Sequence, residues 1–223
     1  LYDRRKKPDV GRVQPMTLEH TTNRIFDALS AHLQSDKRCL VAIAGPPAVG
    51  KSTLAECLCD KLNQAKKQAA IVPMDGFHMD NETLIAKGLL HRKGAPMTFD
   101  VSAFTSTLES LLKEDEVSIP MFDRAKDCTI PNAAKITGGD QYVIVEGNYL
   151  LLDQEDWRDL SQFWGYSVFV EADFDELERR LINRWLDHGL DHTAAKKRAH
   201  DNDIVNAATV LNHRMPSDLT LIN

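Results

Sequence analysis

The sequence predicts an α/β fold with three layers, α/β/α, in which helices flank a central parallel sheet and a small helical lid covers one edge. Three observations lead to this prediction. Short apolar runs alternate with segments whose apolar residues recur every three or four positions. A glycine-rich segment joins the first apolar run to a periodic segment, and polar residues follow directly after later runs. Strands that alternate with helices favour parallel pairing through right-handed crossovers.

The expected elements follow from these patterns. Apolar runs predict strands at residues 39–44, 69–74, 142–145, 166–170 and 219–222, with a further short strand at 117–120. Helical periodicity predicts helices at about 17–33, 52–62, 100–112 and 194–212, and one more that begins after Asp173, where Asp173 and Glu176 form a capping-box pattern. Residues 81–98 are expected to form loops with one short helix, and about 125–140 an irregular segment that covers a pocket.

Length and composition limit the class of protein. The 223 residues are 43% hydrophobic and 27% charged, which suits a single domain, 1–223, with one core and a lid at about 179–195. The net charge of −6 argues against binding to duplex nucleic acid, because that function needs a continuous basic surface. No nucleic-acid partner is therefore expected.

The expected compartment is the cytoplasm. No apolar stretch approaches the length that spans a bilayer, and the basic residues 1–7 precede no apolar region of the signal-peptide type. The four cysteines show no metal-binding spacing and suit a reducing compartment as free thiols. We therefore expect no membrane partner.

A phosphate-binding motif follows the first predicted strand. Residues 45–52 fit the pattern G-x-x-x-x-G-K-[ST], whose backbone N–H groups can surround the phosphates of ATP. Lys51 can reach the β- and γ-phosphates, and the hydroxyl of Ser52 can hold Mg²⁺. The alternative is a glycine-rich turn that binds nothing. The expected nucleotide-binding residues are Gly45, Pro46, Pro47, Ala48, Val49, Gly50, Lys51, Ser52 and Thr53.

Two acidic residues stand where predicted strands end. Asp75 follows the second strand and Glu146 follows the strand at 142–145. In an open parallel sheet, reacting groups gather beyond the carboxyl ends of the strands. Asp75 could accept the proton of a substrate alcohol, and Glu146 could meet Mg²⁺ beside Ser52. Their alternatives are a turn-forming aspartate before Gly76 and a carboxylate that caps a loop or helix.

Arginines on the helix that begins after Asp173 complete the predicted site. Arg180 and Arg184 lie one turn apart and flank the apolar stripe, whereas Arg179 projects toward the opposite side. Guanidinium groups can stabilise the phosphoryl group in transfer, so Arg180 and Arg184 are expected catalytic residues together with Lys51 and Asp75. A solvated charged helix face is the alternative, and it is the expectation for Arg179. Residues 187–191 have the polar residues and glycine of a lid hinge.

With these motifs, the chain resembles the phosphoribulokinase and uridine kinase family of P-loop kinases from about residue 40 to 222. It looks nearest to bacterial pantothenate kinase and to relatives often labelled fructose transport system kinases. The motifs that carry the resemblance are DGFHMDN at 75–81, HRKGAPMTFD at 91–100, PMFDR at 120–124, VIVEGNYLLL at 143–152 and ERRLINRW at 178–185. The resemblance implies that Asp75 is the base, Glu146 binds the metal, and Arg180 and Arg184 belong to the lid.

The resemblance leaves the acceptor open. Uridine kinases carry an NFDHP-like segment where this chain has residues 92–96, and an aromatic-Asp-Phe where it has Phe122, Asp123 and Arg124. Arg92 and Arg124 would suit a carboxylate or phosphate on the acceptor, and Asp123 and Asn148 would suit sugar hydroxyls. The full set of expected acceptor contacts is His78, Arg92, Asp123, Arg124, Asn148 and Tyr149.

The sequence thus predicts a kinase that uses ATP and Mg²⁺ to phosphorylate a hydroxyl of a small metabolite: a sugar, a sugar derivative or a pantothenate-like compound. A nucleoside kinase and a non-catalytic nucleotide-binding regulator are the alternatives. A regulatory GTPase is disfavoured because the chain has no N-K-x-D motif. The oligomeric state is open, with a homodimer among the options.

Overall fold

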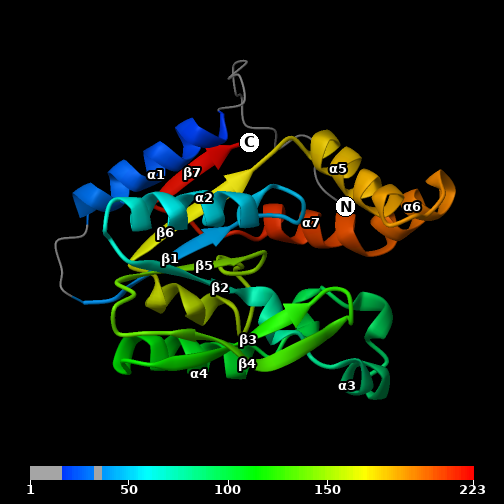
Figure 1. Cartoon of the computed structure of the whole chain (residues 1–223). Helices are drawn as coiled ribbons and strands as arrows, with labels where there is room; N and C mark the ends of the chain where they lie inside the picture. Colours follow the sequence, from blue (N-terminus) through cyan, green and yellow to red (C-terminus); the bar gives the residue numbers. More distant parts are fainter. Residues whose placement is uncertain (1–16, 33–36) are drawn as a thin grey trace.

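The computed structural model describes residues 17–32 and 37–223. Its main sheet has five parallel strands in the order β2-β5-β1-β6-β7 (Figure 1). The strands are β1 (Cys39–Ala44), β2 (Ala69–Pro73), β5 (Tyr142–Gly147), β6 (Tyr166–Glu171) and β7 (Leu219–Ile222). The predicted α/β fold with a central parallel sheet is confirmed.

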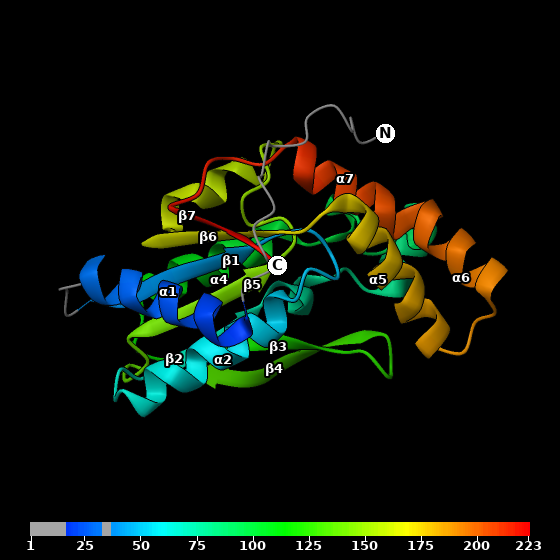
Figure 2. The same cartoon turned by 90° about the horizontal axis from the view of Figure 1, so that it is seen from above.

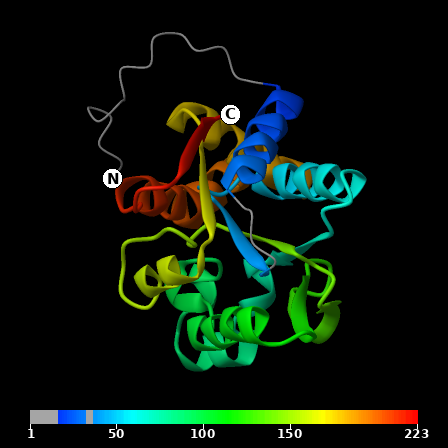
Figure 3. The ribbon, with the colours of Figure 1, turned by 90° about the vertical axis from the view of Figure 1, so that its left-hand side faces the viewer.

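Helices cover both faces of the sheet. All six residues of β1 are buried, because alternate side chains of this central strand point to opposite faces. On one face, Val41 and Ile43 pack with α1 (Leu18–His32) and α2 (Lys51–Gln64). On the other, Leu40 packs in the cluster that contains side chains of α4 (Val101–Lys113). Figure 3 shows the blue and cyan helices α1 and α2 on one side of the sheet and the green α4 on the other. The helix predicted at 17–33 corresponds to α1, and residue 33 lies outside the described residues, as do residues 1–16.

A helical arm, which we define as α5 to α7, extends past the carboxyl ends of the strands (Figure 2). It contains α5 (Phe174–Asp187), α6 (His192–Arg198), a π-helical turn (Ala199–Asp203) and α7 (Ile204–Asn212). The single continuous helix predicted at 194–212 is therefore interrupted. A π-helical turn inserts an extra residue into the helix, which apolar periodicity does not reveal.

A two-stranded antiparallel hairpin lies beside the main sheet. It pairs β3 (Val117–Asp123) with β4 (Cys128–Ile136), so the prediction of an irregular segment over about 125–140 is wrong. Most of β4 is exposed and the strand contains Pro131, so no apolar alternation marks it in the sequence. The two strands satisfy each other's backbone groups instead, with a register shift between Ile119 and Met121.

Short elements connect the sheet to this hairpin. They are η2 (Met74–Phe77), α3 (Asn81–Ala86), η3 (Leu90–Arg92) and η4 (Pro96–Thr98), which precede α4. A further short helix, η5 (Arg158–Phe163), lies between β5 and β6. Gly76, in η2, lies against the hairpin: a Cβ atom there would come 2.3 Å from the carbonyl oxygen of Pro120. Glycine is needed for this close approach, which fixes the end of β2 against β3.

Among the described helices, none combines the length and the apolar character needed to cross a bilayer. The compartment remains a prediction.

Candidate active site

A cleft of about 800 Å³ opens where β1, β2 and β5 end. Residues from six parts of the chain line it: the phosphate loop, the end of β2, the segment 78–99, the β3–β4 hairpin, the end of β5 and the helical arm. The ends of β2 and β5 coincide because the two strands pair in register, with Pro73 opposite Glu146. The predicted ligand edge of the sheet therefore contains a cavity large enough for a small-molecule site.

The phosphate loop runs between β1 and α2. Gly50, just before α2, has a φ of 94°, a left-handed conformation that favours glycine and that lets the loop turn into the helix. Pro47, Ala48, Gly50, Ser52 and Thr53 line the cleft. The first turn of α2 has no acidic residue, so the free N–H groups and the helix dipole favour an anion there. Gly45, Pro46 and Val49 belong to the same loop without appearing in the cleft wall.

Lys51 is a buried cation inside this loop. Its side chain donates to the carbonyl oxygen of Pro46 at 2.9 Å and to Oδ1 of Asn148 at 2.7 Å. Burial lowers the pKa of Lys51 to about 8, although the negative charges of Glu146 and Asp75 act in the opposite direction. A phosphate anion nearby would stabilise the charged form, so this lysine is suited to bind one.

Ser52 and Glu146 meet beside Lys51. Glu146 is 8% exposed, and burial raises its pKa, while Lys51 and a hydrogen bond from the Ser52 hydroxyl lower it. Oxygen ligands of this kind suit Mg²⁺, which is usually held by one or two protein groups together with water and phosphate oxygens. Within residues 17–32 and 37–223, no group of three or more His, Cys, Asp or Glu could hold a metal. The donor set therefore fits a metal shared with a nucleotide.

Asp75 lies across the cleft from the phosphate loop, next to Arg124 of the hairpin. Nη2 of Arg124 lies 2.9 Å from Oδ2 of Asp75. Arg124 is 73% exposed at its side chain, whereas Asp75 is 31% exposed. The pair is therefore open to solvent on the arginine side, where a substrate would enter.

The wall near Asp75 combines rings and polar groups. His78 stacks between Phe99 and Phe122, with ring centroids 4.1 Å and 4.7 Å away, and its Nδ1 donates to the Asp75 carbonyl oxygen at 2.8 Å. Burial lowers the pKa of His78. Lys93, which is not among the expected acceptor contacts, lies 2.8 Å from a carboxylate oxygen of Asp127. This wall forms the end of the cleft that could hold an acceptor.

The arginines of α5 have different surroundings. Nε of Arg180 donates to Glu176 at 2.7 Å, and Nη1 of Arg180 donates to the Ala48 carbonyl oxygen at 3.4 Å, which places it beside the phosphate loop. Arg184 lines the cleft, and its Nη2 lies 3.2 Å from Oδ2 of Asp203. Arg179 pairs with Glu176 and is 61% exposed at its side chain.

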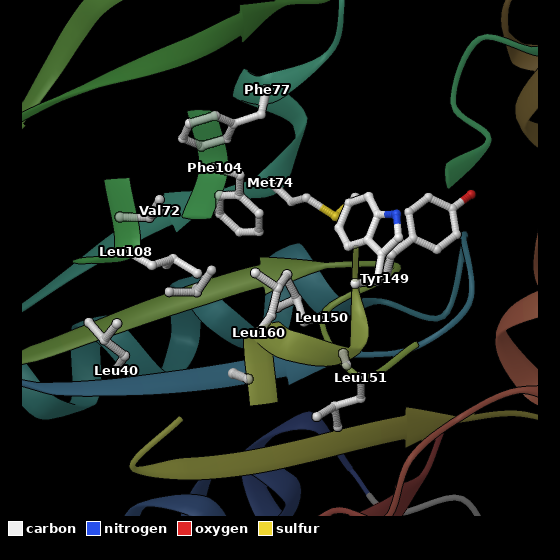
Figure 4. Close-up of a cluster of buried hydrophobic side chains, with 14 of the residues drawn as sticks. Leu40, Val72, Met74, Phe77, Phe104, Leu108, Tyr149, Leu150, Leu151 and Leu160 are labelled. Carbon is white, nitrogen blue, oxygen red and sulfur yellow. The ribbon is translucent and has the colours of Figure 1, made fainter. Parts of the chain in front are cut away.

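Three expected acceptor contacts do not line this cleft. Tyr149 is fully buried in an apolar cluster (Figure 4), where its hydroxyl donates to the Gly94 carbonyl oxygen at 2.6 Å. Asp123 accepts hydrogen bonds from backbone N–H groups of the hairpin turn, at Ala125 and Lys126. Arg92 donates to Asp201 and Asn206 and faces a smaller cavity of about 400 Å³. His78, Arg124 and Asn148 do line the main cleft.

The structure adds cleft residues that sequence reasoning missed. They include Asn81, Lys93, Asp127, Trp185, Arg198, Asp203 and Asn206. One signal was available: Asn202, Asp203 and Asn206 are polar residues within a predicted helix, and all three are buried. A helix that buries polar groups on one face needs partners for them, which often mark a site.

Comparison with known proteins identifies the family. A model described as the phosphoribulokinase / uridine kinase family matches residues 40–202. The chain belongs to this family. Membership of this family supports the assignment of the chain as a phosphotransferase whose P-loop binds ATP.

Individual relatives agree with this assignment. The chain is 37% identical to the uncharacterised protein YggC of Escherichia coli K12 over 82% of its length and 77% of that protein. It is 31% identical to a Streptococcus pneumoniae pantothenate kinase over 66% of its length, and it spans only 49% of that enzyme. The crystal structure of a candidate fructose transport system kinase from Silicibacter sp. TM1040 superposes with a TM-score of 0.85 at 45% identity, covering 92% of this chain and 98% of the other.

Proposed function

We propose that this protein transfers the γ-phosphoryl group of ATP to a hydroxyl of a small metabolite: a sugar, a sugar derivative or a pantothenate-like compound. The observation that carries the proposal is the arrangement of charges around one cleft. Lys51 and the loop amides stand on one side and the carboxylate of Asp75 on the other. Glu146 at the end of β5 and Ser52 in the first turn of α2 meet through a hydrogen bond in the same cleft.

The cleft supplies each part that phosphoryl transfer needs. The loop amides and Lys51 hold the β- and γ-phosphates, while Arg180 and Arg184 approach from the helical arm. Mg²⁺ bound by Ser52 and Glu146 would neutralise charge on the phosphates. The acceptor oxygen attacks the γ-phosphorus, its proton passes to Asp75, and ADP leaves with the electrons of the broken P–O bond.

Arg124 favours an acceptor that carries a carboxylate or a phosphate. It is the exposed member of its pair with Asp75, so an anionic group of the substrate could engage its remaining N–H donors. Such contact would draw the guanidinium away from Asp75 and leave that carboxylate free to take the proton. The relatives named as pantothenate and fructose transport system kinases provide two acceptors to test first.

The decisive experiment is a screen for phosphorylated products. The protein with ATP and Mg²⁺ is incubated separately with sugars, sugar acids, sugar phosphates, pantothenate and nucleosides, and the products are identified by mass spectrometry. We expect one class of hydroxyl compound to gain a phosphoryl group. Phosphorylation of uridine or cytidine alone would favour the nucleoside-kinase alternative, and ATP binding without any product would favour a nucleotide-binding regulator.

The cytoplasmic compartment, the absence of nucleic-acid and membrane partners, and a homodimer stay predictions. Fractionation of the source cells and sedimentation of the purified protein would test them.

A further inference from the structure

Two guanidinium groups lie over the indole ring of Trp185 in the helical arm. The Arg184 Cζ atom is 5.5 Å from the ring centroid and the Arg198 Cζ atom is 4.9 Å from it. All three residues line the main cleft. Arg184 comes from α5 and Arg198 from the end of α6, so the ring joins two helices of the arm at the cleft wall.

The two arginines differ in their partners. Arg184 pairs with Asp203, and the neighbours Arg180 and Lys197 also pair with carboxylates. Within residues 17–32 and 37–223, the Arg198 side chain makes no hydrogen bond or ion pair, and its contact is the face of Trp185. Arg198 is half-buried. A half-buried guanidinium at a cleft wall, with its N–H donors free, is a site for an anion.

The ring itself is held in place. Nε1 of Trp185 donates to Oδ2 of Asp203 at 2.5 Å, and Asp203 is 8% exposed. The same carboxylate oxygen pairs with Arg184. The cation–π contact holds the Arg198 guanidinium at the face of this ring, and among the described residues its N–H groups make no hydrogen bond. Trp185 is therefore suited to orient Arg198. Asp203 in turn orients both the Trp185 ring and Arg184.

We infer that Arg198 binds the terminal phosphates of the nucleotide as a second arginine beside Arg184, and that Trp185 positions it. This inference rests on the proposed function, because it assigns the cation to the phosphates of the same ATP. Its geometric basis is that Arg198, Arg184 and Lys51 line one cleft. A planar guanidinium can bind two oxygens of a phosphate through two parallel N–H groups, whereas a lysine acts as a point charge without this fixed geometry.

The test compares the affinity for ATP and for AMP by isothermal titration calorimetry. Arg198→Gln should weaken ATP binding by about ten- to a hundredfold, the effect of losing a hydrogen bond to a charged group, and should change AMP binding by less than about threefold. Arg198→Lys keeps the charge, so its ATP affinity should lie between that of the unsubstituted chain and that of Arg198→Gln. The matched control is Arg179→Gln, because Arg179 is an exposed arginine of α5 that pairs with Glu176 outside the cleft.

A second pair of variants tests the positioning role. Trp185→Leu should weaken ATP binding as Arg198→Gln does, whereas Trp185→Phe keeps an aromatic face and should restore most of the affinity. ATP affinity unchanged in Arg198→Gln would overturn the inference, and so would an equal loss for ATP and AMP. If Trp185→Leu binds ATP as the unsubstituted chain does, Trp185 has no positioning role.

These outcomes are separable from the proposed function. Calorimetry needs no acceptor, so selective loss of ATP affinity in Arg198→Gln would support the inference even if no compound in the screen were phosphorylated. Conversely, the unsubstituted chain and Arg198→Gln could phosphorylate an acceptor equally fast and bind ATP with equal affinity. That result would leave the kinase assignment intact and remove Arg198 from the site.

Discussion

Nη2 of Arg124 lies 2.9 Å from Oδ2 of Asp75, so an exposed cation of the hairpin neutralises the carboxylate that stands opposite the phosphate loop. Because Arg124 is more exposed than its partner, this pairing leaves it accessible to a substrate. The first two predictions concern these two residues.

Asp75→Asn should keep nucleotide binding and lose most turnover. The amide is close in size to the carboxylate but cannot take up the proton of the substrate hydroxyl. General bases contribute about 10²- to 10⁴-fold to the rate. Steady-state kinetics with the acceptor found in the screen measure the loss, and calorimetry with ATP should give an affinity within about threefold of the unsubstituted chain. Undiminished turnover would remove Asp75 from the mechanism.

Arg124→Gln should raise KM for an anionic acceptor by about tenfold or more, because a charge-assisted contact is lost, and should leave KM for ATP nearly unchanged. The control is Lys126→Gln, which removes a neighbouring cation of the hairpin that pairs with Asp123. An unchanged acceptor KM in Arg124→Gln would show that the acceptor does not use this arginine.

Glu146→Gln should raise the Mg²⁺ concentration that gives half-maximal turnover by about tenfold or more, because a neutral amide is a weaker ligand for this hard cation. Ser52→Ala should act in the same direction through loss of the hydroxyl. Activity titrated against Mg²⁺ at saturating ATP measures both effects. An identical Mg²⁺ dependence in Glu146→Gln would exclude that carboxylate as a ligand.

ATP affinity should fall as the pH rises through about 8, the lowered pKa of Lys51. Below this pH the lysine is charged and attracts the phosphates; above it the free protein holds a neutral amine that must first take up a proton. The affinity should therefore drop by up to about tenfold per pH unit above pH 8. Calorimetry at pH 7.0 to 9.5 checks this, and Lys51→Met should bind more weakly and lose the dependence.

Gly76→Ala should destabilise the protein and disturb the acceptor end of the cleft. The new Cβ would lie 2.3 Å from the Pro120 carbonyl oxygen, so backbone must move, at a cost of about 1 to 3 kcal/mol. Urea unfolding measures the change. Gly138→Ala is the control, because its nearest contact would be an ordinary 3.5 Å. Equal stabilities for the two variants would contradict the close packing of η2 on β3.

Much of the site could be predicted because it depends on local sequence. The phosphate loop follows a buried strand, and the positions of Asp75 and Glu146 follow from strand ends in a parallel sheet. Tyr149 shows the limit of this reasoning: it lies two residues after the end of β5, yet its ring packs in the apolar cluster and its hydroxyl donates to the Gly94 carbonyl oxygen. Adjacency along the chain does not determine which way a side chain points.

The sequence by itself determined the alternation of strands and helices, the phosphate loop and the edge of the sheet at which the acidic residues gather, because each is encoded in periodicity or in a short motif. Tertiary structure alone decided the pairing of Arg124 with Asp75, the β3–β4 hairpin, and the meeting of Trp185, Arg198 and Asp203. The Arg124–Asp75 pair joins residues 49 positions apart, and the Trp185 contacts join separate helices of the arm. The hairpin pairs β3 with a largely exposed strand that has no apolar alternation. These contacts depend on how whole elements pack, which no local pattern records.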